Sequence, residues 1–313
     1  MPLSSDLHDL VNQFLEYLEV EKNASPLTIR NYRHYLERFL RFGASQSPTL
    51  STPASINLEF IRKYRLFLSR FVDEFGISLA RITQNYHMIA LRSFLRYMIK
   101  RDITTISPEK IELPKAESRS LKFLEREQIE RLLNMPDTSD EAGLRDKAIM
   151  EVLFSTGLRV SELAKLNRDS INFERKEFGV IGKGGRARVV FLSDKAVYWM
   201  EKYLNKRQDG HKPLFLRYAG RKIDIITTGG EDLRLTVRSI QRIVEKYVRK
   251  ARLPIKITPH GLRHSFATDL LSGGADIRAI QEMLGHKNIS TTQIYTHVTN
   301  PRLREIHQKY HRR

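Results

Sequence analysis

The sequence predicts a mainly α-helical protein with two domains, and three observations lead to this fold class. The chain has 313 residues, more than one compact core usually holds, since single domains commonly run to roughly 100–200 residues. Apolar residues recur at the period of a helix along most of the chain. The period changes once, at residues 177–193, where two apolar runs flank a glycine-rich turn and predict a small antiparallel β-sheet.

The first hundred residues predict a four-helix bundle, with helices near 7–18, 25–40, 55–72 and 80–100. The second helix has a clear start, because Ser25 is suited to cap it and the proline that follows fits its first turn. We expect the apolar stripe of the fourth helix to face the core; it comprises Ile82, Tyr86, Ile89, Ala90, Phe94 and Tyr97.

Residues 105–119 predict a linker between a first domain of residues 1–104 and a second, α-rich domain of residues 120–313. The linker contains two prolines and many charges but little periodicity. Within 217–235, apolar alternation and a Gly-Gly turn predict a further hairpin. The helices of the second domain are expected at 120–135, 144–157, 160–166, 194–207, 236–251, 258–274, 276–286 and 290–298.

The charge of the chain predicts a polyanionic partner. The formal net charge is +18, and residues 201–313 hold 23 Lys and Arg against 10 Asp and Glu, whereas residues 101–150 hold 9 against 11. Such concentrated, arginine-rich charge favours nucleic acid. On the bundle, the alternative of a merely solvated face stays open for each basic residue. The candidates there are Arg30, Arg33, Arg38, Arg41, Arg62, Lys63, Arg65, Arg81, Arg92 and Arg96.

Several classes of protein are disfavoured by composition. The chain has no cysteine, which excludes disulfides, thiolate catalysis and sulfur-based zinc sites. No apolar run approaches the roughly 20 residues of a membrane span, and acids stand near the N-terminus where a signal peptide carries bases. We therefore expect a soluble, cytoplasmic protein without a membrane partner.

Two basic residues near glycines, Arg159 and Lys183, are candidates for the site. Gly157 can end a helix in a left-handed turn and place Arg159 at the start of the next helix; the alternative is an arginine that is only ion-paired, with Glu162 three residues on. Lys183 stands in the turn of the predicted hairpin, where lysine is also common without a function. The spacing of a phosphate-binding P-loop is absent there.

The helix predicted at 258–274 carries a second group. His260 and Arg263 are three residues apart and share one face, which the expected buried stripe of Leu262, Phe266 and Leu270 does not occupy. His264 is spaced to share a metal with His260. We discount a metal, because the glutamate of H-E-x-x-H is missing and an arginine would place a cation in the site.

His286 and Tyr295 are nine residues apart, and a break in the helix lets them converge. Gly285 is suited to end one helix, so His286 begins a loop. Ser290 and Gln293 form a capping box that starts a new helix with Tyr295 in its second turn. On one continuous helix the two side chains would point to opposite faces.

Together these six residues suit phosphoryl transfer without a metal. Two guanidinium groups can hold a phosphodiester and offset charge in the transition state. Tyrosine, with a pKa of about 10, becomes a nucleophile once a neutral histidine accepts its proton. A lysine on a hairpin could protonate the departing sugar oxygen. The six are Arg159, Lys183, His260, Arg263, His286 and Tyr295.

The motifs "TGLRVSEL", "GKGGRARVV", "PHGLRHSFAT" and "LGHKNISTTQIYTHV" resemble those of the tyrosine recombinases of the phage-integrase superfamily, and most of all the Xer-like recombinases. "ASPLTIRNYRHYLERFL" and "RSFLRYM" resemble the family's SAM-like core-binding domain. The resemblance covers essentially the whole chain. It implies a DNA-clamping N-terminal domain, a catalytic C-terminal domain, and a terminal helix near 300–313 that docks on a neighbouring protomer; the alternative for this last segment is a frayed basic tail.

The resemblance also implies a role for each site residue. Tyr295 attacks the scissile phosphate and forms a 3′-phosphotyrosyl link, while Arg159 and Arg263 bind the phosphate and His286 assists them. His260 transfers a proton and Lys183 is the acid for the 5′-oxygen.

The implied partner is double-stranded DNA with a palindromic-type site, bound by a homotetramer on two sites; a second recombinase in a heterotetramer and an accessory regulator are alternatives. No cofactor, ATP or metal is implied. The role is chromosome-dimer resolution or mobile-element integration and excision. A type IB topoisomerase and a non-catalytic DNA-binding regulator, reading DNA with residues 236–251, are the alternative functions.

Overall fold

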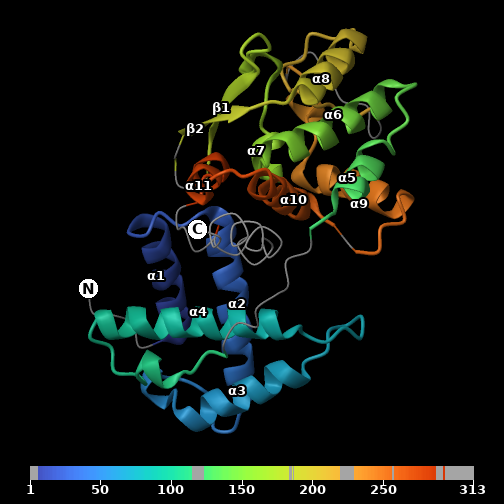
Figure 1. The fold of residues 1–313 in the computed structure, drawn as a ribbon. Coiled ribbons are helices and arrows are strands. Elements are labelled where there is room, and N and C mark those ends of the chain that lie inside the picture. Colours follow the sequence, from blue (N-terminus) through green and yellow to red (C-terminus); the bar gives the residue numbers. More distant parts are fainter. Residues whose placement is uncertain are drawn as a thin grey trace, which may run out of the picture. The chain divides into compact units, whose positions relative to one another are not determined.

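The computed structural model describes residues 6–114, 123–182, 185, 187–218, 229–255, 257–286 and 292. The chain forms two compact units, Met1–Ser118 and Arg119–Arg313. Both are mainly helical, as the sequence predicts, and the second contains a two-stranded sheet (Figure 1). In the described part of the chain, every helix is too short or too polar to cross a membrane.

The first unit is a bundle of four α-helices, and this prediction is confirmed. Ser25 caps the second helix by accepting a hydrogen bond from the Thr28 amide at 3.2 Å, as expected. The fully buried rings of Phe14, Phe39 and Phe94 lie at its centre. The elements are α1 (Leu7–Val20), α2 (Pro26–Ala44), η1 (Pro53–Ser55), α3 (Leu58–Arg70), α4 (Arg81–Lys100) and η2 (Pro108–Lys110). Of the segment expected as a linker, Ile106, Ile111 and Leu113 pack on this core.

The predicted inward face of α4 is wrong over its first half. Ile82, Tyr86 and Ile89 are exposed, at 41%, 48% and 38%, whereas Ala90, Phe94 and Tyr97 are buried as expected. His87 takes the inward position, one residue and therefore about 100° round the helix from Tyr86. His87 is 1% exposed, and its ring nitrogens lie within hydrogen-bonding distance of the Tyr64 hydroxyl and an Arg38 nitrogen, so its polar atoms have partners inside the bundle. A polar residue with buried partners was not identifiable from an apolar pattern.

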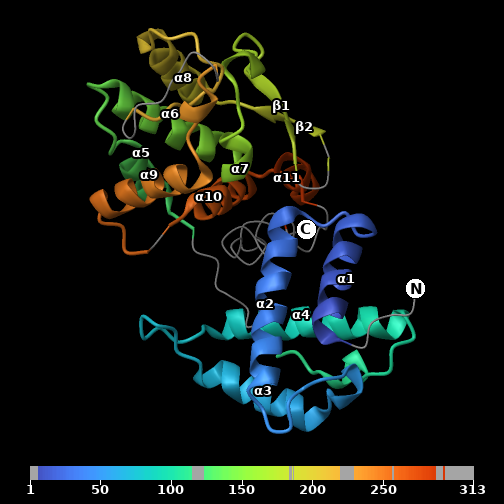
Figure 2. The same cartoon turned by 180° about the vertical axis from the view of Figure 1, so that it is seen from behind.

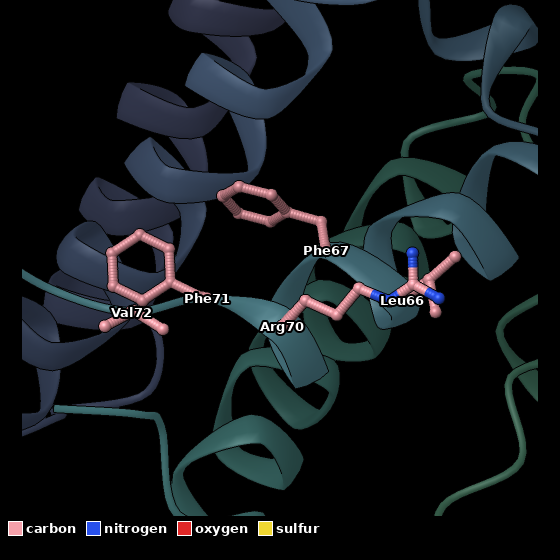
Figure 3. Close-up of a pocket in the computed structure, with 5 residues that line it drawn as sticks. All are labelled: Leu66, Phe67, Arg70, Phe71 and Val72. Atoms are coloured by element: carbon pink, nitrogen blue, oxygen red, sulfur yellow. The ribbon is translucent and has the colours of Figure 1, made fainter. Parts of the chain in front are cut away.

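A shallow hollow of about 620 Å³ lies at the C-terminal end of α3. Figure 3 shows the Phe67 and Phe71 rings beside it, with Arg70 extending away from Phe71. The Arg38 guanidinium lies over the Phe71 ring, 4.3 Å from its centre. None of the residues predicted for the site lines this hollow.

The second unit is built round α6 (Glu141–Thr156), which is buried on almost all sides and packs against α8, α9 and α10. In both views α10 lies beside α11 (Figures 1 and 2). The hairpin is confirmed: β1 (Glu177–Ile181) pairs antiparallel with β2 (Ala187–Phe191). The other elements are α5 (Arg126–Leu133), α7 (Val160–Leu163), η3 (Arg168–Ser170), α8 (Asp194–Lys206), η4 (Glu231–Leu233), α9 (Val237–Lys250), α10 (Pro259–Ser272) and α11 (Ile277–Leu284).

The predicted buried stripe of α10 is wrong in part. On α10, Leu262 is buried, but Phe266 and Leu270 are only partly buried, and the buried surface also includes Arg263 and the polar residues beside it. The reason is that α10 packs against both α6 and α11, so its sides are covered whatever their polarity. For the expected hairpin in 217–235, an antiparallel bridge joins Leu216 to Arg234, and residues 219–228 lie outside the described part.

Candidate active site

Three consecutive carbonyl groups at the end of α11 each accept a hydrogen bond from a different arginine. The last carbonyls of a helix have no partner within it and carry the negative end of its dipole, so they favour cations. Gly285 ends the helix with a left-handed φ of 63°, as predicted. The pairs are Arg188 Nε with Met283 O at 3.1 Å, Arg263 Nη2 with Leu284 O at 2.6 Å, and Arg159 Nη2 with Gly285 O at 3.3 Å.

Arg159 is placed by a turn and an ion pair. Gly157 ends α6 in the left-handed conformation that the sequence predicts, and Arg159 caps α7. Glu162 accepts a hydrogen bond from the Arg159 amide and another from its Nη1, both at 2.9 Å. The ion pair considered as an alternative is therefore present, yet the Arg159 side chain remains 32% exposed.

Glu162 is an anion inside this arrangement. Its side chain is 5% exposed, and it accepts two further hydrogen bonds from Arg188. Burial alone would raise the pKa of Glu162, but the hydrogen bonds from Arg188 and from the Arg159 amide outweigh it and hold that pKa at about 2. The carboxylate is consequently charged at neutral pH.

Arg263 is buried, with 2% exposure, in the first half of α10. Its Nη1 donates to Gly157 O at 2.7 Å while Nη2 donates to the Leu284 carbonyl. The side chain thereby joins the C-terminal end of α6 to that of α11. Its position is fixed before any substrate binds.

The histidines beside these arginines are held neutral. The ring centres of His260 and His264 are 4.3 Å apart. Partial burial and the charges of Arg263 and Arg159 lower the pKa of His260, and the same causes in the same order lower the pKa of His286 to about 4. Neutral imidazoles can accept a proton or donate a hydrogen bond at pH 7.

The second unit thus brings together four of the six predicted residues: Arg159, His260, Arg263 and His286. Lys183 and Tyr295 lie outside the described residues, as does the predicted terminal helix at 300–313. Throughout the part of the chain that is described, there is no group of three or more His, Asp or Glu residues that could hold a metal ion.

Two residues of the site, Thr292 and Arg188, were not predicted from the sequence. Thr292 is fully buried, and its Oγ1 lies 2.9 Å from Nδ1 of His286. Arg188 stands two residues before the buried Val190 and so shares its face of β2. A charged residue on the buried face of a strand requires a partner, and that is a signal the sequence contained.

Comparison with known proteins identifies the family. Residues 122–302 match the phage integrase family, and residues 11–102 match the phage integrase N-terminal SAM-like domain. The chain belongs to the phage integrase family. The resemblance seen in the sequence motifs is confirmed. The chain is an Xer-like tyrosine recombinase, an enzyme that transfers DNA strands in site-specific recombination.

Family members of two kinds are similar over nearly the full length. The tyrosine recombinase XerC of Pelotomaculum thermopropionicum is 38% identical over 310 residues, covering 97% of this chain and 98% of that protein. The tyrosine recombinase XerD of Listeria innocua is 36% identical over 308 residues, covering 98% of this chain and 100% of that protein. These similar values do not assign the chain to either kind.

Solved structures of the family share the fold. The XerA recombinase is 29% identical, with a TM-score of 0.52 over 98% of this chain and 99% of that one. The XerH site-specific recombinase bound to palindromic difH is 23% identical, with a TM-score of 0.69 over 95% of this chain and 83% of that one. At that identity the XerH structure supports the fold alone.

Proposed function

We propose that this recombinase cuts and rejoins duplex DNA at a palindromic-type site through a 3′-phosphotyrosyl intermediate, using the six residues named from the sequence. The observation that carries the proposal is the convergence of Arg159, His260, Arg263 and His286 at the end of α11. Two guanidinium groups beside two neutral imidazoles suit a phosphodiester, whose charge grows in the transition state.

The proposed chemistry has two balanced steps. The Tyr295 hydroxyl oxygen bonds to phosphorus as its proton passes to His260, and the bond to the 5′-oxygen breaks as Lys183 protonates that oxygen. Arg159 presents an exposed guanidinium to the phosphate and Arg263 supplies a fixed charge behind it. A 5′-hydroxyl oxygen then bonds to phosphorus as its proton passes to Lys183, and the bond to the Tyr295 oxygen breaks as His260 returns a proton to it. The bond energy is retained throughout, so the cycle needs no ATP.

Binding is proposed to use both domains, residues 1–104 and 120–313, joined by the linker at 105–119, on double-stranded DNA. Seven of the ten basic residues named on the bundle are exposed, which supports a DNA-facing role. Local ion pairs, such as Arg62 with Glu59 at 2.7 Å, reduce the charge that some of them offer. Four protomers on two sites are proposed, as the family resemblance implies; among the relatives, a lambda integrase dimer bound to a core site and XerH on a palindromic substrate support binding to recombination sites.

A trapping experiment tests the nucleophile. A duplex is first selected on the purified protein from a pool with two randomised inverted arms round a short spacer, and is then nicked near the cleavage point so that the released fragment diffuses away. The wild-type chain should form a covalent protein–DNA complex that survives denaturation. Tyr295→Phe should form none, and Tyr310→Phe should behave as wild type. A complex retained in Tyr295→Phe and lost in Tyr310→Phe overturns the assignment.

The same DNA separates the alternative activities. On a plasmid carrying two copies of the site, a recombinase yields excised circles, whereas a type IB topoisomerase only relaxes supercoils. Excision by the purified chain alone supports a homotetramer, and excision only after a second recombinase or accessory protein is added supports the heterotetramer. Locating the selected site in the source chromosome then distinguishes dimer resolution from integration and excision.

A further inference from the structure

Arg188 on β2 connects three elements of the proposed active site. Its Nη1 and Nη2 donate to Glu162 Oε1 and Oε2, at 3.1 and 2.8 Å, and its Nε donates to the Met283 carbonyl at 3.1 Å. The side chain is 11% exposed. All three of its nitrogens are thus bonded inside the protein, to α7 and to the end of α11.

The contact between Arg188 and Glu162 changes how much of the Arg159 charge is neutralised. Arg159 and Glu162 alone would form a neutral pair, and a buried carboxylate with a single partner would draw both terminal nitrogens of that partner toward itself. Because Arg188 binds both oxygens of Glu162, the Arg159 guanidinium donates only its Nη1 there and directs Nη2 to Gly285 O. The group of two arginines and one glutamate therefore keeps a net positive charge.

The surrounding backbone accommodates Arg188 closely. A Cβ atom placed on Gly285 would lie 3.2 Å from both Cδ and Nη1 of Arg188, which is tighter than usual contact. The strand that carries Arg188 also follows the turn that contains Lys183 in the sequence. One side chain thus holds the hairpin, α7 and the carbonyl end next to His286 together.

We propose that Arg188 is a positioning residue for strand transfer: by neutralising Glu162 it leaves the charge of Arg159 available to the scissile phosphate. The inference rests on the proposed function. Arg188 itself is not placed in contact with the DNA. Its effect belongs to the cleavage step, since its side chain is 11% exposed and its nitrogens are bonded to Glu162 and the Met283 carbonyl.

Single-turnover cleavage of the nicked duplex, at saturating protein, tests the inference with Arg188→Gln. Cleavage should slow about 10²-fold, the effect expected of a misplaced catalytic group, while the affinity for the uncut duplex is unchanged. Arg188→Lys keeps the charge and should recover most of the rate. Arg234→Gln is the matched control: Arg234 also holds an ion pair and backbone carbonyls, those of Ala164 and Leu166.

The dependence on pH separates positioning from a merely structural role. Glu162 faces Arg159 on its own helix and Arg188 from β2. Without Arg188 its carboxylate should protonate more readily, which would release Arg159. The ratio of the Arg188→Gln rate to the wild-type rate should therefore rise as pH falls from about 8 to about 5.5, within the range where shifted carboxyl groups titrate. In the double variant Glu162→Gln/Arg188→Gln this rise should disappear and the rate at pH 7.5 should exceed that of Arg188→Gln.

Three outcomes are decisive. A wild-type rate in Arg188→Gln overturns this inference alone. The inference is also overturned if Arg188→Gln lowers the cleavage rate only in proportion to its loss of thermal stability, equally at every pH, and Arg234→Gln does the same. Arg188 would then have a structural role only. If the wild-type chain forms no covalent complex on the selected duplex, the proposed function fails first.

Discussion

The Nδ1 atom of His286 lies 2.9 Å from the hydroxyl oxygen of Thr292, and Thr292 is completely buried. Thr292 is six positions after His286 in the sequence. A hydrogen bond at one ring nitrogen of a histidine sets the orientation of the ring and directs the other nitrogen. The contact with Thr292 therefore leaves Nε2 of His286 as the ring nitrogen available for the proposed contact with the scissile phosphate.

Replacing Thr292 by valine should slow cleavage about tenfold or more, because the imidazole loses the bond that orients it. Single-turnover formation of the covalent complex on the nicked duplex measures the effect. Thr292→Ser retains the hydroxyl and should stay close to wild type. Equal rates for the valine and serine variants would show that the hydroxyl does not orient His286.

Gly157→Ala should destabilise the second unit by about 2–4 kcal/mol, as left-handed strain adds to a steric clash. At φ 59° a Cβ would lie 2.4 Å from Cδ1 of Phe266. Urea unfolding followed by the fluorescence of Trp199, the chain's single tryptophan, reports on this unit. Gly229 has a φ of 57° and open space around it, so Gly229→Ala should lower the unfolding free energy by only about 1 kcal/mol, through backbone strain alone. Equal losses of unfolding free energy in both variants would show that the contact with Phe266 does not contribute.

Tyr247→Phe should cost about 1–3 kcal/mol of unfolding free energy, because a buried carboxylate oxygen loses its hydrogen bond and keeps only the ion pair with Lys246, at 3.8 Å. The Tyr247 hydroxyl donates to Asp146 Oδ2 at 2.9 Å, while Arg145 binds the other oxygen of this carboxylate, which is 3% exposed. The same Trp199 unfolding curve measures the loss. Tyr198→Phe, on the exposed face of α8, is the control and should leave the midpoint unchanged. A wild-type midpoint for Tyr247→Phe would rule out this contribution.

His87 should make the first unit less stable as the solution is acidified. Burial, and after it the charge of Arg38, lower the pKa of His87 to about 4, against about 6.5 in an unfolded chain. Between these values the unfolded chain binds a proton that the folded chain does not. Stability is therefore full above about pH 6.5 and falls by roughly 3 kcal/mol toward pH 4.

Urea unfolding followed by helical circular dichroism at about pH 7.5 and pH 5 tests this dependence. His87→Gln removes the titrating group and should weaken the dependence on pH. His8→Gln, at an exposed position on α1, should leave the dependence as it is in the wild type. An unchanged pH dependence in His87→Gln would show that His87 does not contribute to it.

Local interactions made much of the fold predictable. Helix periods, the cap at Ser25, and the glycine stops at Gly157 and Gly285 depend on residues a few positions apart. The hairpin was predictable because its turn and two apolar runs are contiguous. The face of α4 was not, since the inward position of His87 depends on Tyr64 and Arg38 from other helices.

The sequence by itself determined the family, the helical class and the residue types that phosphoryl transfer requires. Only the tertiary structure decided which groups hold them in place. Arg159 meets the Gly285 carbonyl across 126 residues, and Arg263 meets the Gly157 carbonyl across 106. Backbone carbonyls have no signature in a sequence, and which arginine reaches which one depends on how α6, α10 and α11 pack. The charge left on Arg159 is accordingly a property of that packing.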